Sequence, residues 1–88
     1  MLEGECFYGK LNGDVKKYDK EGKLVFEGKY FNDKRNGKGK LYNKEGKLKF
    51  DGEFINNEKN GKWKEYNKKG ELVYEGLYLG GKRFKKID

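Results

Sequence analysis

The sequence predicts an all-β protein, a single-layer antiparallel meander of about eight strands made of tandem β-hairpins. Three observations support this fold class. The chain superposes on itself, without insertions, at the period set by residues 12–35 and 36–59. Aromatic residues, which favour strands, make up 16% of an otherwise polar chain. No segment combines the apolar period of a helix with helix caps.

The repeat organises the whole chain as one domain. A half unit at 2–11 precedes three full units at 12–35, 36–59 and 60–83, and a partial unit at 84–88 follows them. Each unit is too small to bury a face alone, so we expect neighbouring units to stack.

Each unit is expected to form one hairpin. In the middle unit, a short strand from Lys38 to Asn43 leads through a turn into a longer strand from Lys47 to about Ile55. An Asx residue begins each predicted type I turn, and a glycine with positive φ closes it. The paired positions are Asp19 and Gly22, Asn43 and Gly46, and Asn67 and Gly70. Loops that end in Asn-Gly at 12–13, 36–37 and 60–61 are expected to join the units.

Alternation predicts which side chains share a face. Leu24, Phe26, Gly28 and Tyr30 fall on one side of the first long strand, and each full unit repeats the pattern. We expect the strand glycines to let a ring lie flat over bare backbone. The turn is expected to place Tyr18 opposite Leu24 and Lys16 opposite Phe26. Two more columns then join this face: Tyr18, Tyr42 and Tyr66, and Lys16, Lys40 and Lys64.

The opposite face carries an apolar row and an acidic row. The apolar row is interpreted as either a second small core or a self-association surface; its members are Phe7, Phe31, Ile55 and Leu79. The acids Glu3, Glu27, Asp51 and Glu75 lie one per unit, roughly 9–10 Å apart. Calcium ligands lie within about 2.6 Å of the ion. We therefore predict no metal site.

These patterns resemble the MORN repeat family. In the first unit the resemblance lies in Phe26-Glu27-Gly28-Lys29-Tyr30, followed by Gly37 and Gly39. The third unit, through Gly61-Lys62-Trp63-Lys64-Glu65-Tyr66 and residues 70–78, is similar to the bacterial branch described as antitoxin-like. The resemblance covers nearly the whole chain. It implies stacked hairpins that serve as scaffolds, dimerisation modules, binders of anionic lipid or neutralisers of toxins.

The chain departs from the family pattern in its loops. The pattern's loop glycine is kept as Gly9 and Gly81, whereas Asp33 and Asn57 occupy the same column in the other units. The loops between units are therefore expected to be less uniform than in the family.

The composition excludes most catalytic chemistry. The chain has no Ser, Thr or His, so it lacks a hydroxyl nucleophile outside tyrosine, an imidazole base and a P-loop. Its single cysteine, Cys6, replaces an aromatic residue of the repeat and is expected to be a small buried filler. We predict no enzyme activity and no cofactor. No apolar run is long enough to span a membrane and no signal peptide is evident, so we expect a cytoplasmic protein.

The candidate binding residues are basic or aromatic. The formal net charge is +7. The lysine column could follow an anionic partner beside the tyrosines, or its stems could simply cover the aromatic ladder. Trp63 breaks its column and is either a packing adjustment or a contact anchor. The last basic cluster, Lys82, Arg83, Lys85 and Lys86, is either a second contact surface or a frayed end.

Three functions remain open at this point. The first is a non-catalytic protein that binds a protein partner, as an inhibitor or neutraliser of the toxin-antidote or phage anti-defence type. The second is a binder of RNA, single-stranded DNA or phosphoinositide through the Lys/Tyr face. The third is a scaffold fragment that forms a homodimer through open terminal strands.

Overall fold

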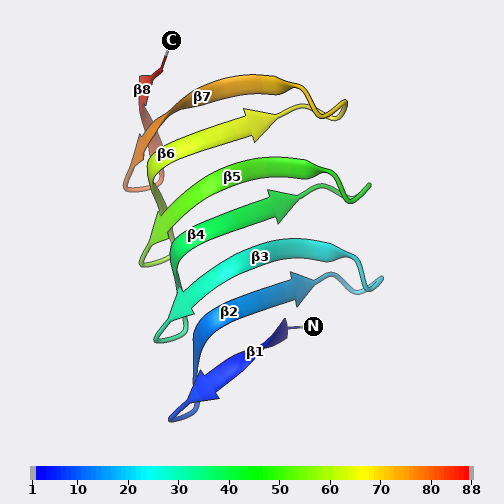
Figure 1. Cartoon of the computed structure of the whole chain (residues 1–88), viewed down its shortest axis with the longest axis vertical. Coiled ribbons are helices and arrows are strands. Elements are labelled where there is room, and N and C mark those ends of the chain that lie inside the picture. The colour runs from blue at the N-terminus through cyan, green and yellow to red at the C-terminus, as the bar shows by residue number, and fades with distance from the viewer. Residues whose placement is uncertain (1, 88) are drawn as a thin grey trace.

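In the computed structural model, which describes residues 2–87, the chain forms one open antiparallel sheet of eight strands (Figure 1). Each strand lies beside the next strand in the sequence, which confirms the predicted meander. The sheet is a single layer that measures 43 × 28 × 14 Å. The strands are β1 (Leu2–Phe7), β2 (Lys10–Tyr18), β3 (Leu24–Phe31), β4 (Lys34–Tyr42), β5 (Leu48–Ile55), β6 (Glu58–Tyr66), β7 (Leu72–Leu79) and β8 (Lys82–Lys86). Asp88, the last residue of the partial unit, lies outside the described residues.

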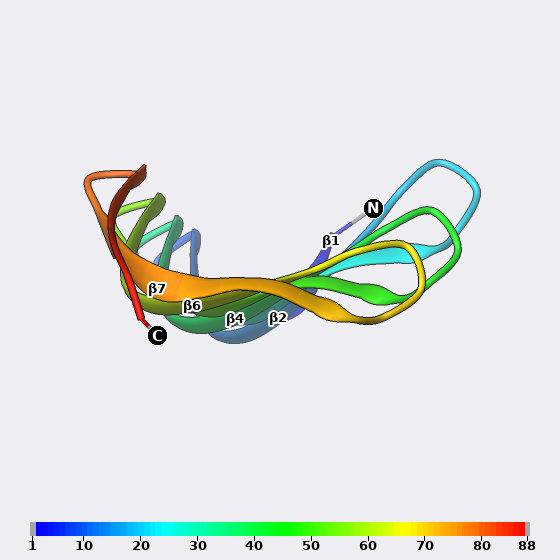
Figure 2. The same ribbon diagram turned by 90° about the horizontal axis from the view of Figure 1, so that it is seen from above.

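The sheet is curved along its strands. Figure 2 shows both rows of turns bent toward the same side of the layer. Among residues 2–87 there is no helix long and apolar enough to cross a membrane.

The turns at one end of the sheet have the predicted chemistry. Between β4 and β5, Asn43 Oδ1 accepts hydrogen bonds from the backbone N–H groups of Glu45 and Lys47, both at 3.0 Å. Gly46 follows with φ 82° and donates its N–H to the Asn43 carbonyl at 3.0 Å. The same hydrogen bonds recur at Asp19 and Asn67, so the predicted turn is confirmed in all three full units.

The turns at the other end differ from the prediction of loops that end in Asn-Gly. β3 and β4 are joined by two residues, Asn32 and Asp33, whose φ angles of 55° and 68° are those of a type I′ turn. The strand resumes at Lys34, so Asn36 and Gly37 lie inside β4 near an irregularity of the pairing. Asn and Asp side chains tolerate positive φ, which makes this tighter turn possible without glycine. The pairs 8–9, 56–57 and 80–81 also have positive φ at both residues, so the expectation of less uniform loops is wrong.

A bulge beside each Asx turn changes which residues share a face. Tyr18 pairs with Leu24, as predicted, but Lys17 rather than Lys16 pairs with Phe26, because Val25 is an extra residue in β3. Lys16 pairs with Glu27 instead. The predicted common face of the lysine column and the aromatic ladder is therefore wrong, and the register of β4–β5 and β6–β7 shows the same shift.

One face of the sheet, here called the aromatic face, carries the core. Phe26, Phe54, Trp63 and Tyr78 form a buried cluster, with Phe54 and Trp63 packed edge to face at a centroid distance of 5.0 Å. The ring of Trp63 covers Gly52 so closely that a Cβ on Gly52 would lie 2.2 Å from Trp63 Cδ2. The predicted packing of rings over strand glycines is confirmed.

The other face, here called the charged face, has no second core within residues 2–87. Phe7, Phe31, Ile55 and Leu79 are 53–63% exposed, so the apolar row is a surface feature. Cys6 is also exposed, which corrects its expected role as a buried filler. It lies on β1, an edge strand with a neighbour on only one side.

Candidate functional site

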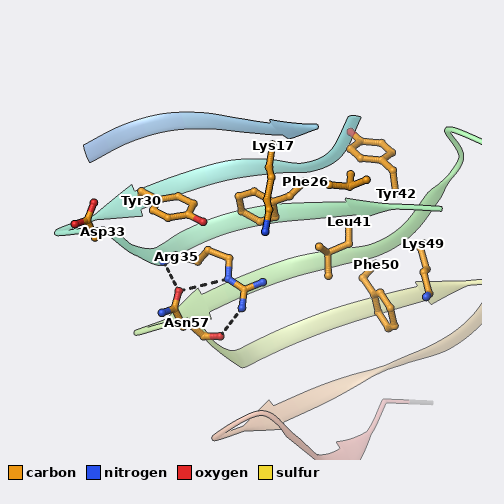
Figure 3. Close-up of a pocket in the computed structure, with 11 residues that line it drawn as sticks. Lys17, Phe26, Tyr30, Asp33, Arg35, Leu41, Tyr42, Lys49, Phe50 and Asn57 are labelled. Atoms are coloured by element: carbon orange, nitrogen blue, oxygen red, sulfur yellow. Dashed lines mark hydrogen bonds between the residues drawn. The ribbon is translucent and has the colours of Figure 1, made fainter. Parts of the chain in front are cut away.

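A hollow of about 560 Å³ lies on the aromatic face over β2–β5 (Figure 3). Its lining combines aromatic and aliphatic side chains with polar and charged ones. The lining residues are Lys17, Val25, Phe26, Tyr30, Asp33, Arg35, Leu41, Tyr42, Lys49, Phe50 and Asn57. With three cations and one carboxylate, the hollow favours an anionic group.

A column of basic residues lies over the aromatic cluster. The guanidinium carbon of Arg35 lies 4.4 Å from the centroid of the Phe54 ring. Lys59 Nζ lies 3.4 Å from the centroid of the Phe50 ring, and the guanidinium carbon of Arg83 lies 4.1 Å from the centroid of the Tyr74 ring. Such cation–π contacts contribute roughly 0.5–1 kcal/mol each at exposed sites. Burial lowers the pKa of Lys59 and outweighs the opposite effect of nearby Glu65.

In the third unit, the basic column binds a carboxylate of the chain itself. Glu65, which is buried, accepts hydrogen bonds from Arg83 Nη2 at 2.8 Å and from the Tyr78 hydroxyl at 2.5 Å. Burial alone would raise the pKa of Glu65, but the hydrogen bonds from Arg83 and Tyr78 lower it overall. Burial and the bond to Glu65 raise the pKa of Tyr78. The ionised carboxylate therefore fastens β8 to β6.

Arg35 has no such partner in the described part of the chain. Its side chain contacts Asn57, through Nη2 to the backbone oxygen at 3.0 Å and Nε to Oδ1 at 3.5 Å. Asn57 Oδ1 also accepts the backbone N–H of Arg35 at 2.8 Å, and Asp33 Oδ1 accepts that of Leu11 at 2.6 Å. The two residues that replace the loop glycine thus tie each turn to the preceding hairpin.

The predicted lysine column lies on the charged face. Lys16 pairs with Glu27 across the strands, and their side chains lie 3.9 Å apart. The acidic and basic columns alternate from strand to strand, in the order Glu3, Lys16, Glu27, Lys40, Asp51, Lys64 and Glu75. Carboxylates on both sides of each lysine reduce its attraction for a polyanion.

The tyrosine column, Tyr18, Tyr42 and Tyr66, lies beside the alternating row of lysines and acids. The Tyr42 hydroxyl donates to Glu27 Oε1 at 3.1 Å. Tyr18 and Tyr66, like Tyr42, are half-buried beside the Asx turns, where they follow the lysines by two positions along the strands. The structure thus keeps the predicted tyrosines and lysines together and separates the lysines from the aromatic cluster, whereas Tyr42 also lines the hollow.

The other predicted site residues fall in two places. Trp63 has no exposed surface, and its Nε1 donates to the Glu53 carbonyl oxygen at 2.7 Å, so it packs the core instead of offering a contact anchor. Lys82, Arg83, Lys85 and Lys86 lie on β8, which is paired with β7. Arg83 belongs to the Glu65 cluster, whereas the three lysines are exposed at the sheet edge.

Sequence reasoning missed Lys17, Tyr30, Arg35 and Lys59 as site residues. A signal was present, because every full unit ends in a basic residue: Arg35, Lys59 and Arg83. This signal could not be interpreted without the two-residue turns, because only these turns place the three basic side chains on strands of the aromatic face rather than in loops.

Residues 2–87 contain no cluster of three or more side chains suited to hold a metal ion. A scan against models of known protein families finds no match for the chain. A search of curated proteins finds no significant relative either.

Proposed function

We propose that this protein is a non-catalytic binding module that recognises a protein partner through its aromatic face and inhibits that partner by covering its surface. The observation that carries the proposal is the hollow over β2–β5. It combines half-buried aromatic side chains with Lys17 and Arg35, neither of which forms an ion pair with the other residues described. Aromatic and arginine side chains are common in the centres of protein interfaces.

The composition supports binding rather than catalysis, since the chain lacks Ser, Thr and His. We further propose that the chain is a MORN-like repeat protein, because the hairpin meander is compatible with that family. The similarity of the third unit to the antitoxin-like branch favours a toxin or a defence protein as the partner. An exposed free thiol at Cys6 is compatible with the reducing cytoplasm as the site of action.

The test is affinity capture from a bacterial lysate, with and without nuclease treatment. The immobilised wild type is compared with an aromatic-face double variant, Arg35→Met with Lys59→Met, and a charged-face control, Lys16→Met with Lys40→Met. We expect the wild type and the control to retain a specific protein that the aromatic-face variant does not, and the added wild type to lower that protein's activity. Circular dichroism establishes that all three are folded.

Two results would contradict the proposal. In one, nuclease removes every captured component, which identifies nucleic acid as the ligand. In the other, the charged-face variant loses the partner while the aromatic-face variant keeps it. The anionic-ligand alternative on the Lys/Tyr face has less support, because that lysine column alternates with carboxylates.

Self-association is a second candidate, favoured by the two edge strands. All residues of β1 and β8 are exposed, and each of these strands has one neighbour in the sheet. An unpaired strand edge is a template for another strand. Sedimentation velocity should show a dimer at high protein concentration, and a strict monomer would exclude this candidate.

A further inference from the structure

The third unit shows how this fold binds a carboxylate on its aromatic face. The Glu65 carboxylate lies between a guanidinium and a phenol, and that guanidinium lies over the Tyr74 ring. The arrangement is charge-assisted and bidentate, the strongest common form of side-chain hydrogen bonding.

The repeat places the same donors around the hollow in the first unit. Arg35 occupies the position of Arg83, Tyr30 that of Tyr78, and Phe26 that of Tyr74. All three line the hollow, with Arg35 and Tyr30 projecting into it (Figure 3). The position of Glu65, however, is occupied by Lys17, which lines the hollow as well. The first unit therefore keeps the carboxylate-binding donors and replaces the carboxylate with a second cation.

No carboxylate of residues 2–87 binds these donors. The Tyr30 hydroxyl makes no hydrogen bond within residues 2–87, and the Arg35 side chain is bonded to the neutral Asn57 alone. The second unit does not repeat the arrangement. Phe54 there lacks the hydroxyl of Tyr30, and Leu41 lacks the charge of Lys17.

We propose that the hollow binds a glutamate or aspartate side chain of the partner protein, whose carboxylate takes the place that Glu65 takes in the third unit. The inference rests on the proposed function and adds the chemistry of the recognised segment. Arg35 and Tyr30 supply the hydrogen bonds, and Lys17 supplies further positive charge. Single-stranded nucleic acid fits less well, because Phe26 and Phe54 are only 2% exposed and Arg35 lies over the Phe54 ring, which leaves little ring surface for bases.

The decisive variant is Lys17→Glu, which restores the internal carboxylate. We expect it to raise the melting temperature and to weaken binding of an acidic peptide at least about tenfold, since an internal carboxylate now occupies the donors. The matched control, Lys16→Glu, adds the same charge on the charged face beside Glu27 and should leave peptide binding within about twofold of wild type, because salt screens distant surface charges. Tyr30→Phe removes one donor, keeps the ring and should also weaken binding.

The probes are an acetylated, amidated dodecapeptide in which Glu alternates with Thr, its Gln counterpart, and a dT12 oligonucleotide. Binding is followed by ¹H–¹⁵N NMR at millimolar peptide. Preferential binding of the Glu peptide, lost in Lys17→Glu and kept in Lys16→Glu, supports the inference. Equal binding of the Gln peptide, absence of Glu-peptide binding, or tighter binding of dT12 overturns it. Lysate capture that persists in Lys17→Glu would also overturn it while leaving the proposed protein-binding function intact.

Discussion

The packing of Trp63 on Gly52 allows a sharp test of the aromatic core. Gly52→Ala adds one methyl group at a position where the backbone itself tolerates alanine, since Gly52 is not among the glycines with positive φ. In a strand, alanine in place of glycine would otherwise stabilise the fold by roughly 0.5–1 kcal/mol. Any net loss of stability therefore has to come from contact with the ring.

The geometry sets the size of that loss. The new Cβ would lie 2.2 Å from Trp63 Cδ2, whereas ordinary contacts are 3.4–4 Å, so the ring has to move by more than about 1 Å. Phe54 at 5.0 Å and Tyr78 at 6.0 Å, measured between centroids, hold the ring in place. Overpacking a fitted core costs about 1–3 kcal/mol. After the backbone gain, we expect Gly52→Ala to lower the free energy of unfolding by about 1–2 kcal/mol.

Urea unfolding followed by far-ultraviolet circular dichroism measures this change and does not depend on tryptophan fluorescence. A double-mutant cycle with Trp63→Leu isolates the contact, because leucine leaves room for the methyl group. In the leucine background, Gly52→Ala should be neutral or stabilising. A loss of unfolding free energy below about 0.5 kcal/mol in the wild type, or an equal loss in both backgrounds, would show that the Trp63 ring does not press on Gly52.

Three further predictions concern the acids and turns. Glu65→Gln should lower the free energy of unfolding by about 1–2 kcal/mol at pH 7. Hydrogen bonding lowers the pKa of Glu65 below its usual 4.5. The stabilisation that ionised Glu65 provides is therefore complete above pH 4.5 and is lost as the pH falls through the lowered pKa. The free energies of unfolding in urea at pH 7 and pH 3 should therefore differ less in Glu65→Gln than in a Glu75→Gln control. Asn43→Ala should cost about 1 kcal/mol by thermal unfolding, whereas Asn43→Asp should cost little, because Asp19 forms the same turn. Burial and the hydrogen bond to Glu27 raise the pKa of Tyr42 above 10.0, so Glu27→Gln should shift part of the ultraviolet tyrosine titration to lower pH.

Local sequence signals were sufficient for the architecture. Period, alternation and the Asx-x-x-Gly turns act over a few residues, so the meander and the turn at Asn43–Gly46 could be predicted without tertiary information. The strand glycines could also be assigned, since Gly28 and Gly52 recur at one position beside aromatic residues.

The faces of β2, β4 and β6 could not be predicted, because a bulge beside each Asx turn reverses which of their side chains lie on the aromatic face. A single extra residue in β3 puts Lys17, rather than Lys16, beside the aromatic cluster. The extra residue is Val25 in the first unit, Lys49 in the second and Val73 in the third, and none of these is a side-chain type that marks a bulge. The candidate site was missed for the same reason, since the role of Arg35 depends on the register around it.

The strictly sequential strand order has a consequence for how the protein opens. Extensive contacts join only consecutive strands, so stability accumulates along one dimension, and the fold can loosen from its ends without disturbing its middle. Three of the four buried rings of the aromatic cluster, Phe54, Trp63 and Tyr78, lie in β5–β7, whereas β1 is exposed throughout. Amide exchange should therefore be fastest at β1 and slowest near Trp63. A partner bound in the hollow over β2–β5 would slow amide exchange in those strands. It would thereby stabilise the half of the sheet that has fewer buried rings and that otherwise opens first, strand by strand.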